Sequence, residues 1–300
     1  MRVAIAGATG LIGTALTSSL RADGHTVHRL VRRANDAAAS DVVWNPSANQ
    51  VDARGLEGVD AIVNLSGERI DQRWTTSVKR AIRDSRVGST ALLARTAASL
   101  SSRPKVFVNA SAIGIYGSRG DEELDESSTL GDNFLARVVR DWEAATSPAS
   151  AAGIRLVLVR NGVVLAKEHG ALARLLPTFR LGAGGRAGSG AQWLSWISLE
   201  DDVRALRAAL RDTRFAGPMN FVAPNPVTNE EFAKTLGRVL GRPAMVHVPQ
   251  FAFELMFGEM ARETILASQR VHPRALTATG FEFRHPTVAG ALRAILGDGH

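Results

Sequence analysis

The chain of 300 residues contains no cysteine. That absence excludes disulfide bonds, thiolate nucleophiles and zinc sites built from thiolates. It also fits a reducing compartment, and we expect a cytoplasmic protein. Long apolar runs are missing too. None approaches the roughly 20 residues that a membrane-spanning helix needs, so we expect no membrane partner. The apolar stretch at residues 2–6 stops at a glycine after one strand's length, which favours mature structure over a signal peptide.

Lysine is scarce as well. Four lysines accompany 32 arginines, since Lys and Arg together number 36, and the formal net charge is +7. These basic residues are spread along the chain and interleaved with acids, whereas nucleic-acid-binding proteins concentrate them on one stripe or helix. We therefore expect no nucleic-acid partner. The histidines occur singly, without an H-x-x-x-H or His/Asp cluster, so we also expect no metal site.

What the chain does have is an alternation of strand-like and helix-like segments. Short apolar runs alternate with helical periodicity in the order 2–6, 11–21, 25–31, 60–65, 74–100, 105–109, 133–151 and 155–159. This alternation predicts an α/β fold with a doubly wound parallel sheet, Rossmann-like, over residues 1–165. Beyond that point glycine, proline and arginine become denser. We expect residues 166–300 to form a smaller α+β cap on the substrate side, with part of 190–222 completing the sheet.

A glycine-rich loop joins the first predicted strand to the first predicted helix. Gly7, Gly10 and Gly13 have the spacing G-x-x-G-x-x-G. Gly7 permits a tight turn, Gly10 lets the backbone approach a pyrophosphate, and Gly13 lets the helix pack close to the strand. The position of this loop after a strand and before a helix predicts a dinucleotide-binding site. Its other predicted contacts are Thr9, Leu11 and Ile12.

The end of the second predicted strand bears on which dinucleotide binds. An acidic residue there would bond the ribose 2′-hydroxyl of NAD, but this chain has Arg32 and Arg33. Two guanidinium groups suit a 2′-phosphate through charge-assisted hydrogen bonds, which favours NADP(H) as the cofactor. The alternative interpretation is a solvated arginine pair that follows a strand.

Further motifs lie along the chain. They are RVGSTALL at 86–93, SAIGIYG at 111–117, RNGVVL at 160–165 and WISLED at 196–201. Together with the glycine loop, they resemble the motifs of the extended short-chain dehydrogenases/reductases, the NAD(P)-dependent epimerase/dehydratase superfamily. The resemblance implies a Rossmann-like fold, a bound nicotinamide cofactor and a small-molecule substrate.

A second set of motifs is similar to one atypical branch of that superfamily. It comprises NLSGE at 64–68, RW at 73–74, FLA at 134–136, WE at 142–143, GSGAQ at 188–192 and a C-terminal block that ends at Pro286. This branch is an epimerase-like family sometimes labelled a cell-division inhibitor. The resemblance spans nearly the whole chain, and it marks 249–296 as a family-specific segment within the predicted cap.

One superfamily feature is missing, the Tyr-x-x-x-Lys pair. In the superfamily the lysine lowers the tyrosine pKa, so that the phenol exchanges a proton while hydride moves to or from the nicotinamide. By the resemblance this pair belongs on the helix after the SAIGIYG motif, where the chain has Phe134 and Val138. Tyr116, the single tyrosine, cannot replace the pair, because Gly120 lies four residues further on.

Three residues remain candidates for catalytic roles. Tyr116 is expected to shape the substrate pocket, with proton donation near the nicotinamide as the alternative. Ser111 either bonds a substrate carbonyl or hydroxyl or bonds its own loop. Glu143 is either an acid/base group or a surface carboxylate beside a buried tryptophan.

Other contacts are expected from residues that follow the predicted strands or lie in the glycine-rich part of the cap. The expected cofactor contacts are Leu65, Ser66, Gly67, Glu68, Arg73, Ala110, Asn161, Gly162 and Val163. Glu68 and Arg73 could instead form an ion pair at a helix N-terminus. The expected substrate contacts are Arg186, Gln192 and Trp196. An arginine in a glycine-rich loop suits a phosphate or carboxylate, although such loops also carry arginines without a ligand.

Two functions fit these patterns. The first is an NADP(H)-dependent oxidoreductase or epimerase-like enzyme that acts on an unidentified small molecule. The second is a non-catalytic NADPH-binding sensor or regulatory protein, whose cofactor-loaded state is recognised by a partner. Long helices at the edge of the sheet could also pair two copies of the chain as a homodimer.

Overall fold

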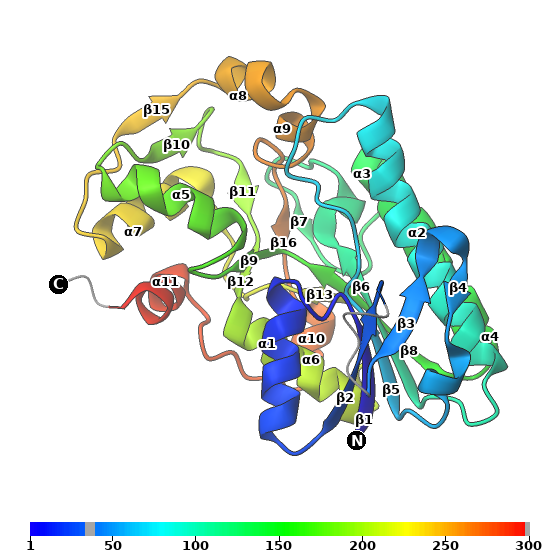
Figure 1. Ribbon diagram of the computed structural model, residues 1–300. Coiled ribbons are helices and arrows are strands. Elements are labelled where there is room, and N and C mark those ends of the chain that lie inside the picture. Colours follow the sequence, from blue (N-terminus) through cyan, green and yellow to red (C-terminus); the bar gives the residue numbers. More distant parts are fainter. Residues whose placement is uncertain (34–39, 298–300) are drawn as a thin grey trace.

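The computed structural model describes residues 1–33 and 40–297 (Figure 1). Within them, one large sheet is made of eight strands. They are β1 (Arg2–Ala6), β2 (Thr26–Val31), β3 (Val42–Asn45), β4 (Gln50–Val51), β5 (Ala61–Asn64), β6 (Val106–Ala112), β8 (Arg155–Asn161) and β13 (Gly217–Phe221). Their spatial order is β13-β8-β6-β5-β1-β2-β3-β4. Neighbouring strands are parallel except β3 and β4, which run antiparallel.

The strand order confirms the predicted doubly wound sheet. From β1 the chain builds outward through β2 and β3, then returns to the other side of β1 and builds outward through β5, β6 and β8. The switch point therefore lies between β1 and β5, and ligands of such sheets bind outside the carboxyl ends of the strands there. The edge strand β13 comes from the second half of the chain. The division of the chain at residue 165 stays a prediction.

Helices cover both faces of this sheet (Figure 1). One face carries α1 (Leu11–Ala22), α6 (Leu199–Arg211) and α10 (Arg274–Ala278), and the other carries α2 (Thr76–Ser99), α3 (Phe134–Ala144) and α4 (Ser147–Ala151). A strand covered on both sides has no solvent face, which explains why β1 is a continuous apolar run rather than an alternating one. Its last four residues are fully buried.

A second hydrophobic core lies in the later part of the chain. It gathers apolar side chains of α5 (Gly170–Arg180), α7 (Asn229–Val239) and α11 (Val288–Leu296). Short strands pair around it and between it and the sheet. They are β9 (Val163–Leu165) with β12 (Trp196–Ser198), β10 (Gly185–Ala187) with β15 (Val246–Val248), β11 (Trp193–Leu194) with β14 (Val227–Thr228), and β7 (Glu123–Leu124) with β16 (Arg270–Val271).

The helices α8 (Gln250–Phe257) and α9 (Glu259–Glu263) belong to a C-terminal segment that contacts the first half of the chain. Glu259 pairs with Lys79 of α2, with both carboxylate oxygens within 2.9 Å of Nζ. The Glu263 carboxylate accepts hydrogen bonds from the backbone N–H groups of Phe134 and Leu135, where the positive end of the α3 dipole favours an anion. The C-terminal segment is therefore bound to the N-terminal ends of α2 and α3.

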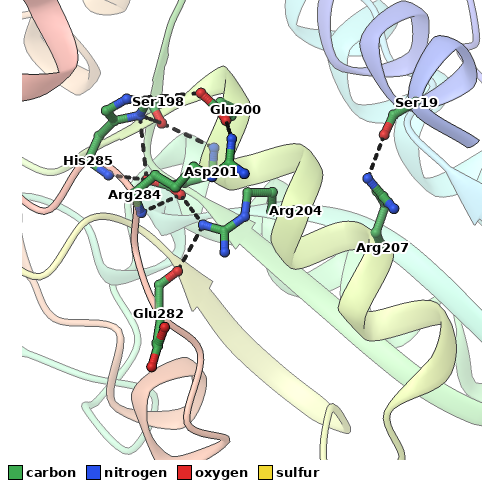
Figure 2. Close-up of polar contacts among 9 residues, drawn as sticks. All are labelled: Ser19, Ser198, Glu200, Asp201, Arg204, Arg207, Glu282, Arg284 and His285. Carbon is green, nitrogen blue, oxygen red and sulfur yellow. Dashed lines mark hydrogen bonds and ion pairs between the residues drawn. The ribbon is translucent and has the colours of Figure 1, made fainter. Parts of the chain in front are cut away.

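The C-terminal residues are also tied to α6 (Figure 2). Asp201, which is fully buried, accepts hydrogen bonds from the backbone N–H groups of Arg284 and His285, each at 2.9 Å, and an ion pair from Arg204 at 3.0 Å. Glu200 pairs with the Arg284 side chain. In residues 1–33 and 40–297, no helix combines the length and the apolar character needed to cross a bilayer.

Candidate cofactor and substrate site

The glycine loop is packed so closely that side chains would not fit. Gly7 has φ +77°, and a Cβ atom added there would lie 2.7 Å from the Leu65 carbonyl. A Cβ on Gly13 would lie 2.1 Å from the Gly7 carbonyl oxygen. Such separations are far inside van der Waals contact, so both positions need glycine. The loop after β1 thus rests directly on the loop after β5, across the switch point.

The N-terminus of α1 directly follows the glycine loop. Gly10 is its N-cap residue, and the structure shows neither a capping side chain nor an acid in the first turn of this helix. Its first backbone N–H groups, which include those of Leu11 and Ile12, therefore lack intrahelical partners. Thr9 and Gly10 are exposed. An uncapped helix N-terminus behind a glycine turn is suited to a pyrophosphate.

Arg32 and Arg33 lie just past the carboxyl end of β2, the strand next to β1. Both are exposed. This position, on the side of β1 away from β5, is the one that the sequence analysis assigned to a 2′-phosphate contact.

Buried amides join the carboxyl ends of β5 and β6. Asn64 Nδ2 donates to Asn109 Oδ1 at 2.9 Å and to Thr90 Oγ1 at 2.8 Å. Ser66 Oγ donates to Asn64 Oδ1 at 2.6 Å, and Trp142 Nε1 donates to Thr90 Oγ1 at 2.9 Å. Sequence reasoning missed the two asparagines. The sequence could have indicated them, because each of two apolar, buried strands carries an asparagine at or near its end. A single polar group in such a strand needs a hydrogen-bond partner.

Ser111, near the end of β6, and Glu143 on α3 meet at Arg160, near the end of β8. Ser111 Oγ donates to Glu143 Oε1 at 2.5 Å. Arg160 donates from Nε and Nη2 to the two Glu143 oxygens, both at 2.9 Å. The Arg160 and Glu143 side chains are only 5% and 12% exposed. Burial alone would lower the pKa of Arg160, but the hydrogen bonds and charge of Glu143 raise it, so the guanidinium keeps its charge.

Tyr116 joins the same cluster from the other side of Arg160. Its hydroxyl accepts a hydrogen bond from Arg160 Nη1 at 3.0 Å and donates to Asn220 Oδ1 at 2.8 Å. The ring is fully buried among apolar side chains, and burial raises the pKa of the phenol. The expectation that Tyr116 lines a substrate pocket does not match this placement, because the side chain has no surface open to solvent. A buried phenol with a raised pKa is also poorly matched to proton transfer near neutral pH.

The structure thus brings the three predicted catalytic residues together around Arg160, which the sequence analysis had treated only as part of a motif. Glu143 is not a surface carboxylate, and within the described part of the chain Ser111 Oγ bonds Glu143 rather than its own loop. Phe134 and Val138, at the positions of the missing pair, lie on α3. The Phe134 ring packs edge-on against Trp74 and lies 4.3 Å from Lys79 Nζ.

Several expected cofactor contacts follow the strands next to this cluster. Ala110 is partly buried in β6, and Asn161 ends β8 with a buried Oδ1 that has no partner in the described part of the chain. A Cβ on Gly162 would lie 2.6 Å from the Ser195 carbonyl oxygen, so this glycine is required by packing. Val163 opens β9 and pairs with Trp196.

Glu68 and Arg73 are both exposed. The Glu68 N–H donates to Ser85 Oγ at 2.9 Å, and Arg73 Nη1 donates to the Leu255 carbonyl at 3.0 Å. Among the described residues they do not pair with each other, so the alternative interpretation, an ion pair at a helix N-terminus, is wrong. Thr75 caps α2 instead.

The three expected substrate contacts have separate structural roles. Trp196 is fully buried in the second core and donates from Nε1 to the Asn225 carbonyl, which leaves it no surface for a substrate. Gln192 is 9% exposed and donates to the Ala187 and Ile265 carbonyls. Arg186 lies 3.6 Å from Glu230 in an ion pair that is about half exposed.

A doubly wound sheet whose glycine loop opens onto the switch point defines a dinucleotide-binding protein of the Rossmann type. Comparison with known families identifies which one. The chain belongs to the NAD-dependent epimerase/dehydratase family, whose model matches residues 3–222. Residues 248–295 match a further family described as a domain of unknown function, DUF1731. These matches confirm the resemblance that the motifs indicated.

Relatives are similar over almost the whole chain. Epimerase family protein Mb2239 of Mycobacterium bovis is 47% identical over 97% of this chain and 96% of its own length. The crystal structure of human epimerase family protein SDR39U1 with NADPH has 38% identity and a TM-score of 0.91, covering 98% of this chain and 99% of that one. A nucleoside-diphosphate sugar epimerase structure from Corynebacterium glutamicum has 39% identity and a TM-score of 0.81, covering 99% of this chain and 58% of that one.

Proposed function

We propose that this chain binds NADPH across the β1/β5 switch point and acts as an NADPH-dependent oxidoreductase or epimerase-like enzyme on a small molecule. The observation that carries the proposal is the glycine loop, where Gly7 and Gly13 exclude side chains and α1 presents an uncapped N-terminus. The human relative solved with NADPH supports the choice of cofactor, as do the exposed Arg32 and Arg33 beyond β2.

Bound NADPH would supply a hydride, and the chain's own groups would position the substrate. Because Ser111 Oγ donates its hydrogen to Glu143, its lone pairs remain to accept a hydrogen bond from a substrate hydroxyl. Arg160 holds the Glu143 carboxylate in place through two parallel bonds. Ala110, Asn161 and Val163 would lie near the nicotinamide. Asn161 Oδ1, which has no partner among the described residues, is an acceptor suited to a carboxamide N–H.

A second candidate function rests on a different observation. Phe134 and Val138 cannot transfer protons, and Tyr116 is buried with a raised pKa. The chain therefore lacks the phenol that the superfamily uses, which favours a non-catalytic NADPH-binding sensor. Under this alternative, a partner would recognise the NADPH-loaded state of the protein. The same crevice would bind the cofactor in both cases.

The first experiment is to purify the protein, denature it and identify the released small molecules by mass spectrometry. NADPH or NADP⁺ without NAD would support the proposed cofactor, and a second ligand would be a substrate candidate. Fluorescence titration of the emptied protein with NADPH and NADH then tests the arginine pair. We expect NADPH to bind at least about tenfold more tightly, and the double variant Arg32→Gln/Arg33→Gln to lose that preference. Equal affinities would reject the NADP assignment.

Turnover separates the two functions. Consumption of NADPH with a carbonyl metabolite, or formation of NADPH from NADP⁺ with a hydroxy metabolite, would establish an enzyme and remove the sensor alternative. We also propose that the protein is cytoplasmic, forms a homodimer and does not bind nucleic acid. Cell fractionation, sedimentation and a salt-dependent DNA-binding assay test them respectively.

A further inference from the structure

The loop after β5 runs along one face of α2. Ser66 Oγ donates to Ser89 Oγ at 3.1 Å, and the Glu68 N–H donates to Ser85 Oγ at 2.9 Å. Arg86 lies between these two serines in the sequence of α2. Because Leu65 of the same loop rests against Gly7, a continuous path of contacts leads from the glycine loop to Arg86.

The guanidinium of Arg86 is held between backbone and an aromatic ring. A Cβ added to Gly67 would lie 3.2 Å from Arg86 Cζ, so the group lies directly against that glycine. Its Cζ lies 5.2 Å from the centroid of the Trp142 ring, a distance typical of a cation–π contact. Nη1 donates to the Ile82 carbonyl at 3.1 Å. These contacts orient the group and satisfy only part of its five-donor fork.

Arg86 has no ion-pair partner within the described part of the chain. Burial lowers the pKa of Arg86 to about 10, and the nearby charge of Glu68 only partly offsets that effect. The group is still charged at neutral pH. Arginines around α6 are arranged differently (Figure 2): Arg204 and Arg284 each pair with a carboxylate. Keeping a partly buried cation without a counter-ion costs stability, and a ligand anion would remove that cost.

The sheet order places Arg86 on the reaction side of the cofactor crevice. Arg32 and Arg33 lie beyond β2, on one side of β1, whereas α2 follows β5 on the other side. The ring that Arg86 contacts belongs to Trp142, the residue before Glu143. Arg86 therefore lies between the glycine loop and the Ser111–Glu143–Arg160 cluster. The cofactor phosphates have other candidate donors in α1 and the Arg32/Arg33 pair.

We propose that Arg86 binds an anionic group of the substrate, a carboxylate or a phosphate, and so restricts the substrate to anionic small molecules. This inference rests on the proposed function, because it takes NADPH to fill the neighbouring part of the crevice. A phosphate of the cofactor itself is the other possible source of the anion, and the experiment distinguishes the two.

The test uses Arg86→Gln, with Arg83→Gln as the matched control one turn earlier on α2. Arg83 is half exposed, and it pairs with Asp141, so its loss should cost little. For each protein, NADPH affinity is measured by fluorescence titration. Binding of inorganic phosphate to the NADPH-saturated protein is then measured by calorimetry at constant ionic strength. Arg86→Lys is included because it retains the charge, and unfolding temperatures are measured without ligand.

We expect wild-type protein and Arg83→Gln to bind phosphate saturably, and Arg86→Gln to bind it at least about tenfold more weakly. Arg86→Lys should fall between them, NADPH affinity should change less than about threefold, and Arg86→Gln should unfold at the wild-type temperature or above. Equal phosphate binding by wild type and Arg86→Gln would overturn the proposal. A tenfold loss of NADPH affinity confined to Arg86→Gln would assign the anion to the cofactor instead.

Two further outcomes are decisive. An unfolding temperature for Arg86→Gln more than about 5 °C below wild type would show that Arg86 is a structural residue and overturn the inference. If wild-type protein fails to bind NADPH, the proposed function fails. The phosphate titration of the ligand-free protein then still decides whether Arg86 binds an anion.

Discussion

Around the carboxyl ends of β1 and β5 the site is made of backbone, whereas around β6, β8 and β13 it is made of interlocked side chains. On the cofactor side, Gly7 and Gly13 leave no room for a Cβ, and an uncapped helix end supplies the donors. On the reaction side, Arg160 pairs with Glu143 and also holds Tyr116. The first region offers backbone donors that suit a pyrophosphate, while the second depends on particular side-chain partners.

This difference explains how a relative of the superfamily can lose its Tyr-x-x-x-Lys pair and keep its cofactor loop. The backbone contacts of the glycine loop do not depend on α3. The other region does depend on α3, because Glu143 of that helix forms a buried ion pair with Arg160, which also donates to the Tyr116 hydroxyl. The substitutions below test that contrast, beginning with the largest expected change in stability.

Removing the carboxylate of Glu143 should have the largest effect. In Glu143→Gln the Arg160 guanidinium, only 5% exposed, loses its counter-ion. We expect a loss of about 3–5 kcal/mol in the free energy of unfolding, measured by urea denaturation. Glu122→Gln is the control, because Glu122 is about half exposed in its ion pair with Arg119, and its loss should cost less than about 1 kcal/mol. Equal losses in the two variants would contradict a buried ion-paired centre.

Adding a methyl group to the glycine loop should come next. Gly13→Ala places a Cβ 2.1 Å from the Gly7 carbonyl oxygen, and the loop must move to relieve the clash. We expect a loss of about 3 kcal/mol in stability together with loss of NADPH binding. Gly88→Ala in α2 is the control, since no described atom lies within 4 Å of its added Cβ, and it should gain about 0.5–1 kcal/mol. Normal NADPH affinity in Gly13→Ala would show that the loop is not a backbone site.

The next prediction contrasts the paired Glu143 with an unpaired buried acid. Burial raises the pKa of Asp202, on α6, from 3.8 to about 8, and neither of its carboxylate oxygens has a partner among residues 1–33 and 40–297. The folded protein binds this proton more tightly than the unfolded chain does. Binding of this proton therefore stabilises the folded protein fully below about pH 4, and this stabilisation is lost as the pH rises toward about 8.

Between pH 5 and pH 8, wild-type stability should fall by on the order of 1 kcal/mol per pH unit relative to Asp202→Asn. Urea denaturation at several pH values measures this difference. Asp212→Asn serves as the control, because the Arg214 side chain hydrogen-bonds that carboxylate and lowers its pKa, which places its titration below this range. Parallel stability curves for wild type and Asp202→Asn would show that Asp202 is ionised in the folded protein.

The smallest effect is expected at the tyrosine. Tyr116→Phe removes a hydroxyl that accepts from Arg160 and donates to Asn220, and it should cost about 1 kcal/mol of stability. NADPH binding and any turnover should stay within about threefold of wild type, because the phenol is buried and its proton is not used. Loss of turnover by more than a hundredfold in a normally stable Tyr116→Phe protein would restore the tyrosine as a proton donor.

The periodicity of the chain was enough to predict the sheet, because a parallel strand covered on both faces must be an apolar run. The glycine spacing was enough to predict the cofactor loop, because only backbone without Cβ can pass so close to Leu65. The contacts of the C-terminal segment were harder to predict. The sequence analysis expected this segment in the cap. It could not predict that Glu259 pairs with Lys79, because the two residues are 180 positions apart and no local sequence pattern indicates the contact.

The sequence alone therefore predicted the local features of the protein. These are the alternation of strands and helices, the glycine turn, the arginines after β2 and the absence of the Tyr-x-x-x-Lys pair. Each depends on the conformation or chemistry of a few neighbouring residues. Only the tertiary structure determined which polar side chains share a buried environment. It placed Ser111, Glu143 and Tyr116 around Arg160, buried Trp196 in a core and left Arg86 without an ion-pair partner among the described residues. Such pairings are decided by packing between distant elements, because burial makes every charge require a partner that the local sequence does not supply.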